Sequence, residues 1–239
     1  PEALKAGPEL VALHSRRFVE ALAELHAVDY AAAGLGSLGK PEGYIDRQVK
    51  GWTKRHLDAL TPGAPDFREI TRWLADHLPG DTGRHSLIHN DYKMDNLIWS
   101  SERPGELIGV LDWELATLGD PLMDLGATLG YWIEAGDPED LQAIRNMPSN
   151  VPGALTRQQL LENYSAVAGW DVPIRQFDFY YVYGLFRRAA ICQQIYYRFH
   201  HGQASDRRFA RLPDSVTALE RHARRVIEGS LQAAGTRTI

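Results

Sequence analysis

Polar residues gathered between short apolar segments give this sequence its clearest capacity for chemistry. His89, Asp91, Lys93 and Asn96 lie close together, and Asp112 follows a later apolar segment. Carboxylate and amide oxygens are ligands that Mg²⁺ prefers, and a carboxylate can accept a proton from an attacking hydroxyl. These residue types therefore suit a reaction that needs a base and a metal ion together.

The segments around these residues predict a β-hairpin. Two short apolar runs, Asn96–Trp99 and Leu107–Leu111, are separated by the turn-rich residues 100–106, which is typical of two strands with a long connecting loop. Because antiparallel strands return the chain, the start of the first strand lies beside the end of the second. The hairpin should thus bring Asp91 and Asn96 next to Asp112.

That arrangement matches what phosphoryl transfer asks of a protein, which is positioning and charge compensation rather than covalent chemistry. We expect Asp91 to accept or orient the proton of the hydroxyl, and Asn96 and Asp112 to hold Mg²⁺. Lys93 lies where its ammonium could meet the transferred phosphate. His89, considered by itself, fits either catalysis or a supporting position in the core. Asp and Asn also serve as turn and cap residues, but this spacing around a hairpin favours a site.

The rest of the sequence predicts helices, so the expected fold class is α+β and mostly helical, with the hairpin embedded before its middle. Ser86–His89 predicts one more short strand. Gly34–Gly43 is expected to be a connector rather than a phosphate-binding loop, because no Lys-Ser/Thr pair follows it. Asp66 and Thr156, each followed three residues later by Glu or Gln, are typical of capping boxes. The predicted helices are Pro8–Val28, Tyr44–Leu60, Asp66–Leu78, Pro121–Glu134, Pro138–Ile144, Thr156–Ala168, Ile174–His201 and Pro213–Ala234.

The composition argues against several other classes of protein. The net charge is −5 and no long basic run occurs, so we expect no nucleic-acid partner. No apolar stretch approaches the roughly 20 residues of a membrane-spanning helix. Cys192 is the single cysteine, and we expect a reducing, cytoplasmic location. The sequence indicates no oligomeric state.

One family shares the spacing of the polar residues. The motif reads His89-x-Asp91-x-x-x-x-Asn96 and then Leu111-Asp112-Trp113. It resembles the aminoglycoside phosphotransferase and choline kinase family, small-molecule kinases related in fold to protein kinases. Asn90 stands where protein kinases have Arg, and Trp113-Glu114 stands where they have Phe-Gly.

The segment that follows Asp112 sharpens the resemblance. The run Gly119–Leu125 is similar to the Gly-Asp-Pro-x-x-Asp-Leu run of a subgroup found with certain acyl-CoA dehydrogenases. Leu25–Val28 resembles the first helix after the interlobe hinge of the same family. Within the Gly119–Leu125 run we expect Asp120 to cap a helix and Asp124 to brace the catalytic loop.

The resemblance implies a fold and a division of the chain. Residues 1–239 would form the carboxy-terminal lobe of a protein-kinase-like fold. Residues 87–125 would carry the catalytic loop and metal site, and residues 8–80 and 126–239 a helical, substrate-binding part. The amino-terminal nucleotide lobe is expected to lie outside this chain, which alone should then bind nucleotide poorly.

The resemblance also implies ATP and Mg²⁺ as cofactors and a hydroxyl group of a small molecule as acceptor, either aminoglycoside-like or of a hydroxyacyl or CoA type. It places Ile98 under the nucleotide base. For Ile98 and Leu111, the two candidate nucleotide-binding residues, packing in the core is the other interpretation.

Further alternatives stay open at this point. The acidic residues between Glu134 and Asp140 could hold an amine or form a solvated helix start. Instead of a kinase, the chain could be a catalytically silent kinase-like binding module. A metal-dependent hydrolase that uses Asp91, Asp112 and His89 is the third hypothesis.

Overall fold

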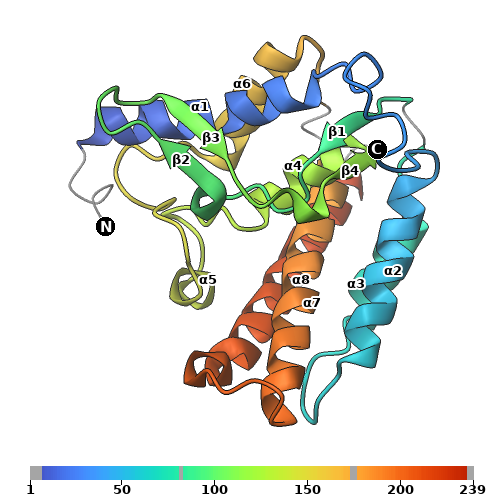
Figure 1. Ribbon diagram of the computed structural model, residues 1–239. Coiled ribbons are helices and arrows are strands. Elements are labelled where there is room, and N and C mark those ends of the chain that lie inside the picture. The colour runs from blue at the N-terminus through green and yellow to red at the C-terminus, as the bar shows by residue number, and fades with distance from the viewer. Residues whose placement is uncertain (1–6, 81–82, 173–176, 236–239) are drawn as a thin grey trace.

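The computed structural model describes residues 7–80, 83–172 and 177–235, and it is mostly helical, as expected (Figure 1). The helices are α1 (Pro8–His26), α2 (Tyr44–Asp58), α3 (Arg68–Asp76), α4 (Pro121–Leu129), α5 (Glu139–Ala143), α6 (Arg157–Ala168), α7 (Asp178–His200) and α8 (Leu212–Gly235), and the short 3-10 helices are η2 (Met94–Asn96), η3 (Trp113–Leu115) and η5 (Arg207–Arg211). The strands are β1 (Ser86–Ile88), β2 (Leu97–Trp99), β3 (Leu107–Val110) and β4 (Thr117–Gly119).

The strands form two separate antiparallel pairs. The predicted hairpin is confirmed, since Leu97 of β2 lies opposite Val110 of β3. The strand predicted at residues 86–89 is also present, but it pairs with β4, with Ile88 opposite Thr117. We did not predict β4, because it is only three residues long and ends in glycine, which strands disfavour. This second pair places the start of α4 beside the start of the catalytic loop.

Several helix boundaries differ from the prediction. No capping box starts α3: its N-cap is Phe67 in a left-handed conformation, although the Asp66 carboxylate accepts a hydrogen bond from the Arg68 amide. The capping box of Thr156 is confirmed. Helix α4 ends at Leu129, short of the predicted end at residue 134, because the following segment turns away toward α5. The predicted start of the long aromatic helix at residues 174–176 lies outside the described residues.

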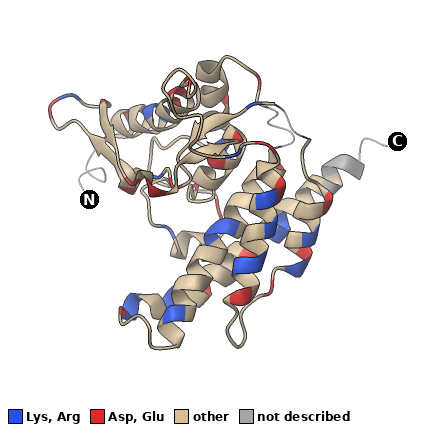
Figure 2. Cartoon of the chain, turned by 45° about the vertical axis from the view of Figure 1, so that its right-hand side comes forward, with Lys and Arg blue, Asp and Glu red and all other residues tan. Residues whose placement is uncertain are grey.

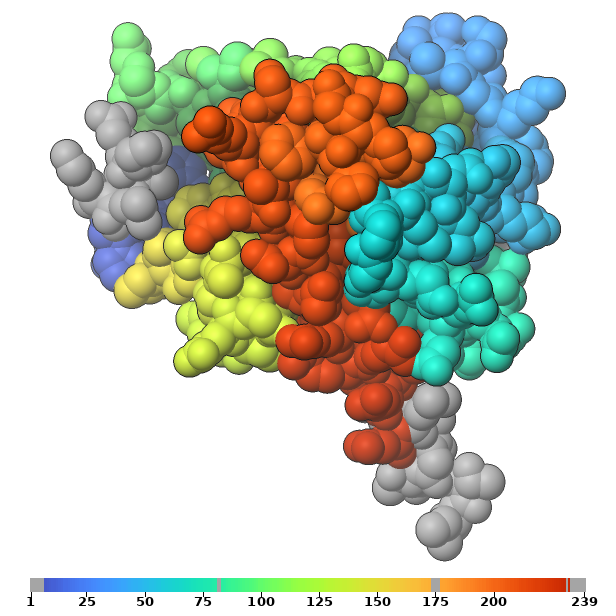
Figure 3. Space-filling view, turned by 90° about the horizontal axis from the view of Figure 1, so that it is seen from below, coloured from blue at the N-terminus to red at the C-terminus, as the bar shows by residue number. Residues whose placement is uncertain are grey.

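Helix α7 occupies the centre of the helical part. Viewed from below, α7 and α8 lie between α2 and α3 on one side and the segment that contains α5 on the other (Figure 3). The crossing of α7 with α4 depends on glycine. A Cβ on Gly184 would lie 2.0 Å from the Gly126 carbonyl oxygen, and a Cβ on Gly130 would lie 2.8 Å from the Gly184 carbonyl carbon. The two backbones therefore touch, which draws α7 close under the catalytic loop.

Charge is mixed over the outer helices. Basic and acidic side chains are interspersed along α2, α3 and α8 rather than divided between faces (Figure 2). In the ranges that the structure describes, no helix is long and apolar enough to cross a membrane.

Candidate active site

The hairpin joins the two predicted metal ligands. The Leu111 amide donates to the Asn96 carbonyl oxygen at 2.8 Å, so Asp112 follows directly after the residue bonded to Asn96. Asp112 has a φ of 65°, which is uncommon for a residue other than glycine. Its side chain is exposed and makes no hydrogen bond or ion pair with any described residue. Asp112 thus presents a free carboxylate one residue after the backbone bond to Asn96.

The Asp91 carboxylate lies at the centre of the loop between β1 and β2. Its Oδ2 accepts from the Lys93 ammonium at 2.6 Å and from the Asn96 side-chain amide at 3.1 Å, and the same amide donates to the Asp91 carbonyl at 2.8 Å. Burial lowers the pKa of Lys93, but its hydrogen bond to Asp91 and the attraction of nearby negative charge together outweigh this, and the net shift is upward. Lys93 therefore stays cationic while it holds Asp91 in place. The side-chain NH₂ of Asn96 is used as donor, whereas its Oδ1 makes no hydrogen bond with any described residue.

His89 ties the loop to the end of the hairpin. Its ring is fully buried, Nε2 lies 2.8 Å from the Leu111 carbonyl oxygen, and Nδ1 accepts from the Asp91 amide at 3.2 Å. Because Nδ1 accepts, Nε2 must carry the proton that is donated to Leu111. The imidazole therefore spans the two segments that carry Asp91 and Asp112.

Asp124 braces the loop from below, as the sequence predicted. Its fully buried carboxylate accepts from the His89 amide at 2.7 Å, from the Asn90 amide at 2.9 Å and from His26 Nε2 at 3.2 Å. Burial favours the neutral acid, but the hydrogen bond from His26 and the amide donors outweigh it and lower the pKa of Asp124. Asp120 caps α4, as predicted, by accepting from the Leu122 amide.

Asn90 is a residue whose part the sequence analysis missed. It has a φ of 65°, its side-chain amide donates to the Leu115 carbonyl at 3.0 Å, and its Oδ1 accepts from the Tyr44 hydroxyl at 2.9 Å. Asn is among the residues that tolerate this left-handed conformation, which was the available signal. The contacts fix the backbone turn that leads into Asp91.

The core-packing interpretation of Ile98 and Leu111 is wrong. Ile98 is 41% exposed and Leu111 48% exposed. A two-stranded hairpin has two faces, and here only one is covered: Leu97 packs into the core while its neighbour Ile98 points outward. Trp113, the residue after Asp112, is also exposed. An open apolar surface therefore borders the free carboxylate of Asp112.

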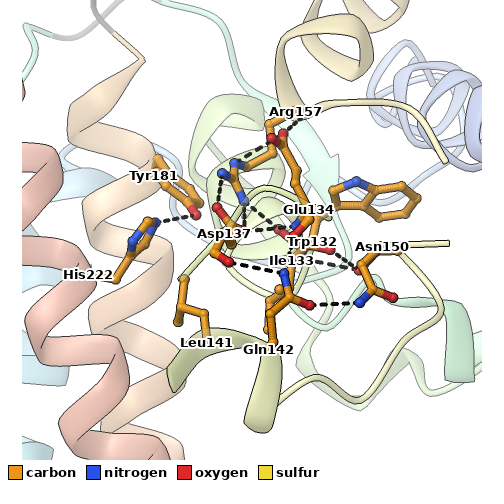
Figure 4. Close-up of polar contacts among 12 residues, drawn as sticks. Trp132, Ile133, Glu134, Asp137, Leu141, Gln142, Asn150, Arg157, Tyr181 and His222 are labelled. Carbon is orange, nitrogen blue, oxygen red and sulfur yellow. Dashed lines mark hydrogen bonds and ion pairs between the residues drawn. The ribbon is translucent and has the colours of Figure 1, made fainter. Parts of the chain in front are cut away.

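The acidic cluster is divided between ion pairs and a solvated helix start, since Glu139 is exposed in the first turn of α5. Arg157 binds the Asp137 carboxylate through both terminal nitrogens at 2.7 Å and also pairs with Glu134, as Figure 4 shows. Asp140 pairs with Arg225 of α8. These contacts neutralise Glu134, Asp137 and Asp140 and anchor the segment that connects α4 to α6.

A magnesium site has a limited set of donors here. In the described part of the chain, no group of three His, Cys, Asp or Glu residues could hold a metal ion. The side-chain oxygens of Asn96 and Asp112 nevertheless fit Mg²⁺, which is commonly bound by few protein oxygens together with phosphate oxygens and water. The unpaired state of the Asp112 carboxylate supports that use.

Comparisons with known proteins agree with the geometry. The profile of the phosphotransferase enzyme family matches residues 4–160. Acyl-CoA dehydrogenase family member 10 of Mus musculus is 38% identical over 187 residues, which are 78% of this chain and 17% of that protein. Acyl-CoA dehydrogenase family member 11 of Homo sapiens is 31% identical over 188 residues, which are 78% of this chain and 24% of that protein. The chain thus spans about a sixth to a quarter of these relatives.

A solved structure extends the agreement to the fold. A protein of Ralstonia eutropha JMP134, assigned as an aminoglycoside phosphotransferase, superposes with a TM-score of 0.77 and 28% sequence identity. The match covers 92% of this chain and 67% of that one. The expected protein-kinase-like fold class is therefore confirmed.

Proposed function

We propose that this chain, which belongs to the phosphotransferase enzyme family, acts in the transfer of a phosphoryl group from ATP to a hydroxyl group of a small molecule. The observation that carries the proposal is the pair of carboxylates, Asp91 and Asp112, that the hairpin and the Leu111–Asn96 bond bring to one end of the sheet. One carboxylate is held by hydrogen bonds and the other is free.

In this mechanism Asp91 orients the acceptor hydroxyl and takes its proton as the bond to phosphorus forms. Lys93 and Asn96 fix the rotamer of Asp91 through their hydrogen bonds. The Lys93 ammonium also lies where it can offset negative charge on the transferred phosphoryl group. His89 and Asp124 act through the backbone, because they hold the amides of His89, Asn90 and Asp91 in place.

Asn96 and Asp112 would hold Mg²⁺, which supplies charge compensation for the nucleotide phosphates. The exposed side chains of Ile98 and Leu111 would form part of an apolar wall against the nucleotide base. The acceptor is aminoglycoside-like or of a hydroxyacyl or CoA type, and the single cysteine fits a cytoplasmic setting.

The test is ADP release by the full-length protein with Mg²⁺, ATP and a panel of hydroxylated small molecules. Asp91→Asn should lower kcat/KM by about 100-fold or more, which is the usual size of a general-base contribution. Asp95→Asn is the matched control, because Asp95 is an exposed carboxylate in the same loop, and it should stay within about twofold of wild type.

Each outcome bears on the proposal. Turnover that survives Asp91→Asn would remove Asp91 from its role. ADP release that needs no acceptor would favour the metal-dependent hydrolase. Binding of acceptors without any transfer in the wild-type protein would favour a silent binding module.

A further inference from the structure

A buried arginine without a hydrogen-bond or ion-pair partner among the described residues lies on α7. Arg187 is only 3% exposed, and its Nε is fully buried with no hydrogen-bond acceptor. Within the described ranges, no hydrogen bond or ion pair involves any nitrogen of Arg187. Its guanidinium lies 5.0 Å from the centre of the Trp52 ring of α2, which is a contact between a cation and an aromatic face.

Such a group needs an explanation, because a buried charge without an ion-pair or hydrogen-bond partner destabilises a fold strongly and native folds satisfy nearly all buried polar atoms. In the described part of the chain, Arg188, which is also buried, and the half-buried Arg157 are both satisfied. The neighbouring Arg188 donates to the carbonyl oxygens of Gly130 and Ile144, at 3.0 and 2.8 Å. Arg157 is paired with Asp137. Arg187 differs from both, although it is at least as buried as Arg188.

The position of Arg187 relates it to the candidate active site through two tyrosines. Lys93 Nζ lies 5.8 Å from the centre of the Tyr131 ring. Burial raises the pKa of Tyr131, Arg187 opposes that shift, and Asp91 reinforces it. The guanidinium of Arg188, the residue after Arg187 on α7, lies 4.9 Å from the centre of the same ring, so this turn of α7 packs against the ring that Lys93 contacts. Tyr44, whose hydroxyl donates to Asn90, is likewise within the electrostatic reach of Arg187.

We propose that Arg187 binds an anionic group of the acceptor whose hydroxyl lies at Asp91, so that the acceptor is a hydroxylated compound carrying a carboxylate or a phosphate. This inference rests on the proposed function and adds a substrate class to it. A guanidinium suits the role because its planar donors match the geometry of carboxylate and phosphate oxygens. An anion would also supply the partner that Arg187 lacks within the fold. The aromatic rings of Trp52, Tyr44 and Tyr131 would surround the connecting part of the acceptor.

The first experiment compares acceptors that differ only in charge. Aliphatic hydroxycarboxylates of increasing length, their carboxamides and the corresponding diol monophosphates are offered to the full-length protein, and the KM of each is measured. Arg187→Gln should raise the KM for the anionic acceptors by about 10- to 100-fold, as expected for a lost charge-assisted hydrogen bond, with little change for the carboxamides. Preference of the wild-type protein for one anionic series identifies the anion as carboxylate or phosphate.

Two further variants separate recognition from packing. Arg187→Lys keeps the charge and should recover part of the affinity. Arg55→Gln is the matched control, since the guanidinium of Arg55 also lies over Trp52, at 4.8 Å, but is exposed. It should leave every KM within about twofold of wild type. An equal rise in KM for charged and neutral acceptors in Arg187→Gln would overturn the proposal.

A binding arm distinguishes failure of this inference from failure of the proposed function. In the Asp91→Asn background, the anionic compounds should still raise the melting temperature by mass action, and adding Arg187→Met should abolish that rise. Without ligand, Arg187→Met should melt at or above the wild-type temperature, because it removes an unpaired buried charge. A lower melting temperature together with unchanged ligand-induced stabilisation would show a purely structural Arg187.

Discussion

Two buried carboxylates of α4 should respond in opposite ways to the same small change. Asp124 accepts three hydrogen bonds from backbone amides and an imidazole while fully buried. Asp120, one turn earlier, accepts from the amides of the first helical turn and reaches the protein surface at 5% exposure. Replacing each with asparagine keeps the shape and removes the charge.

The expected costs follow from the donors that each side chain meets. In Asp124→Asn, one of the two oxygens becomes an NH₂ group that faces an N–H donor, from either His89 or Asn90. A buried partner that loses its charge costs about 3 to 5 kcal/mol. In Asp120→Asn, the remaining oxygen still caps the helix, and Asn is as good an N-cap as Asp. We expect the free energy of unfolding to change there by less than about 1 kcal/mol.

The pH dependence separates the two sites further. The pKa of Asp124 is lowered in the fold, so its contribution to stability is complete above the ordinary carboxyl pKa of 3.8 and is lost as the pH falls through the lower folded value. Burial raises the pKa of Asp120, so the fold loses stability as the pH rises from 3.8 through that higher value. Asp124→Asn should remove the first dependence and Asp120→Asn the second.

The assay is urea denaturation of both variants beside wild type in the full-length protein, with hydrogen exchange of residues 86–100 as the local readout. Asp124→Asn should speed exchange of the amide of either His89 or Asn90, whichever loses its acceptor. If Asp124→Asn proves no more destabilising than Asp120→Asn, the brace between α4 and the catalytic loop does not have the strength inferred here.

Two more perturbations test other parts of the fold. Gly184→Ala should cost about 3 kcal/mol or more, or prevent folding, because its Cβ would meet the Gly126 carbonyl oxygen at 2.0 Å. By contrast, Gly229→Ala, at an exposed position of α8, should stabilise the fold by about 0.5 to 1 kcal/mol. Thermal unfolding measures both changes. Burial lowers the pKa of His222 from 6.5 to about 4, so the free energy of unfolding should fall as the pH drops from about 6.5 to 4. Urea midpoints measured across that range should show this loss in wild type and not in His222→Asn.

The sequence was most informative where spacing carries the structure. The hairpin, the capping box at Thr156 and the roles of Asp120 and Asp124 were predicted because each depends on residues close in sequence or on a run with a family likeness. The pairing of β1 with β4 was not, since it joins short segments about 30 residues apart whose composition is weak as strand.

Long-range partners explain the remaining differences. The sequence of the acidic segment resembles a solvated helix start, and only the arrival of Arg157 and Arg225 from other helices turns it into an anchor. Its hydrophobicity suggests that Ile98 is a core residue. Which face of a two-stranded hairpin is covered depends, however, on the elements that pack against it, and Ile98 lies on the uncovered face. Arg187 lies in a run of aromatic and apolar residues. A charged residue in such a run was a sign of a buried charge, but the spacing of motif residues does not detect it.

The glycine crossing of α4 and α7 has a mechanical consequence. Interlocked side chains can change rotamers and let one helix step past another, but backbone in contact with backbone at Gly126 and Gly184 offers no such intermediate positions. We therefore expect α7 to move over α4 mainly as a lever that rotates about this point. Arg187 sits within one turn of the pivot and would shift little, whereas Phe199 at the far end would sweep the widest arc.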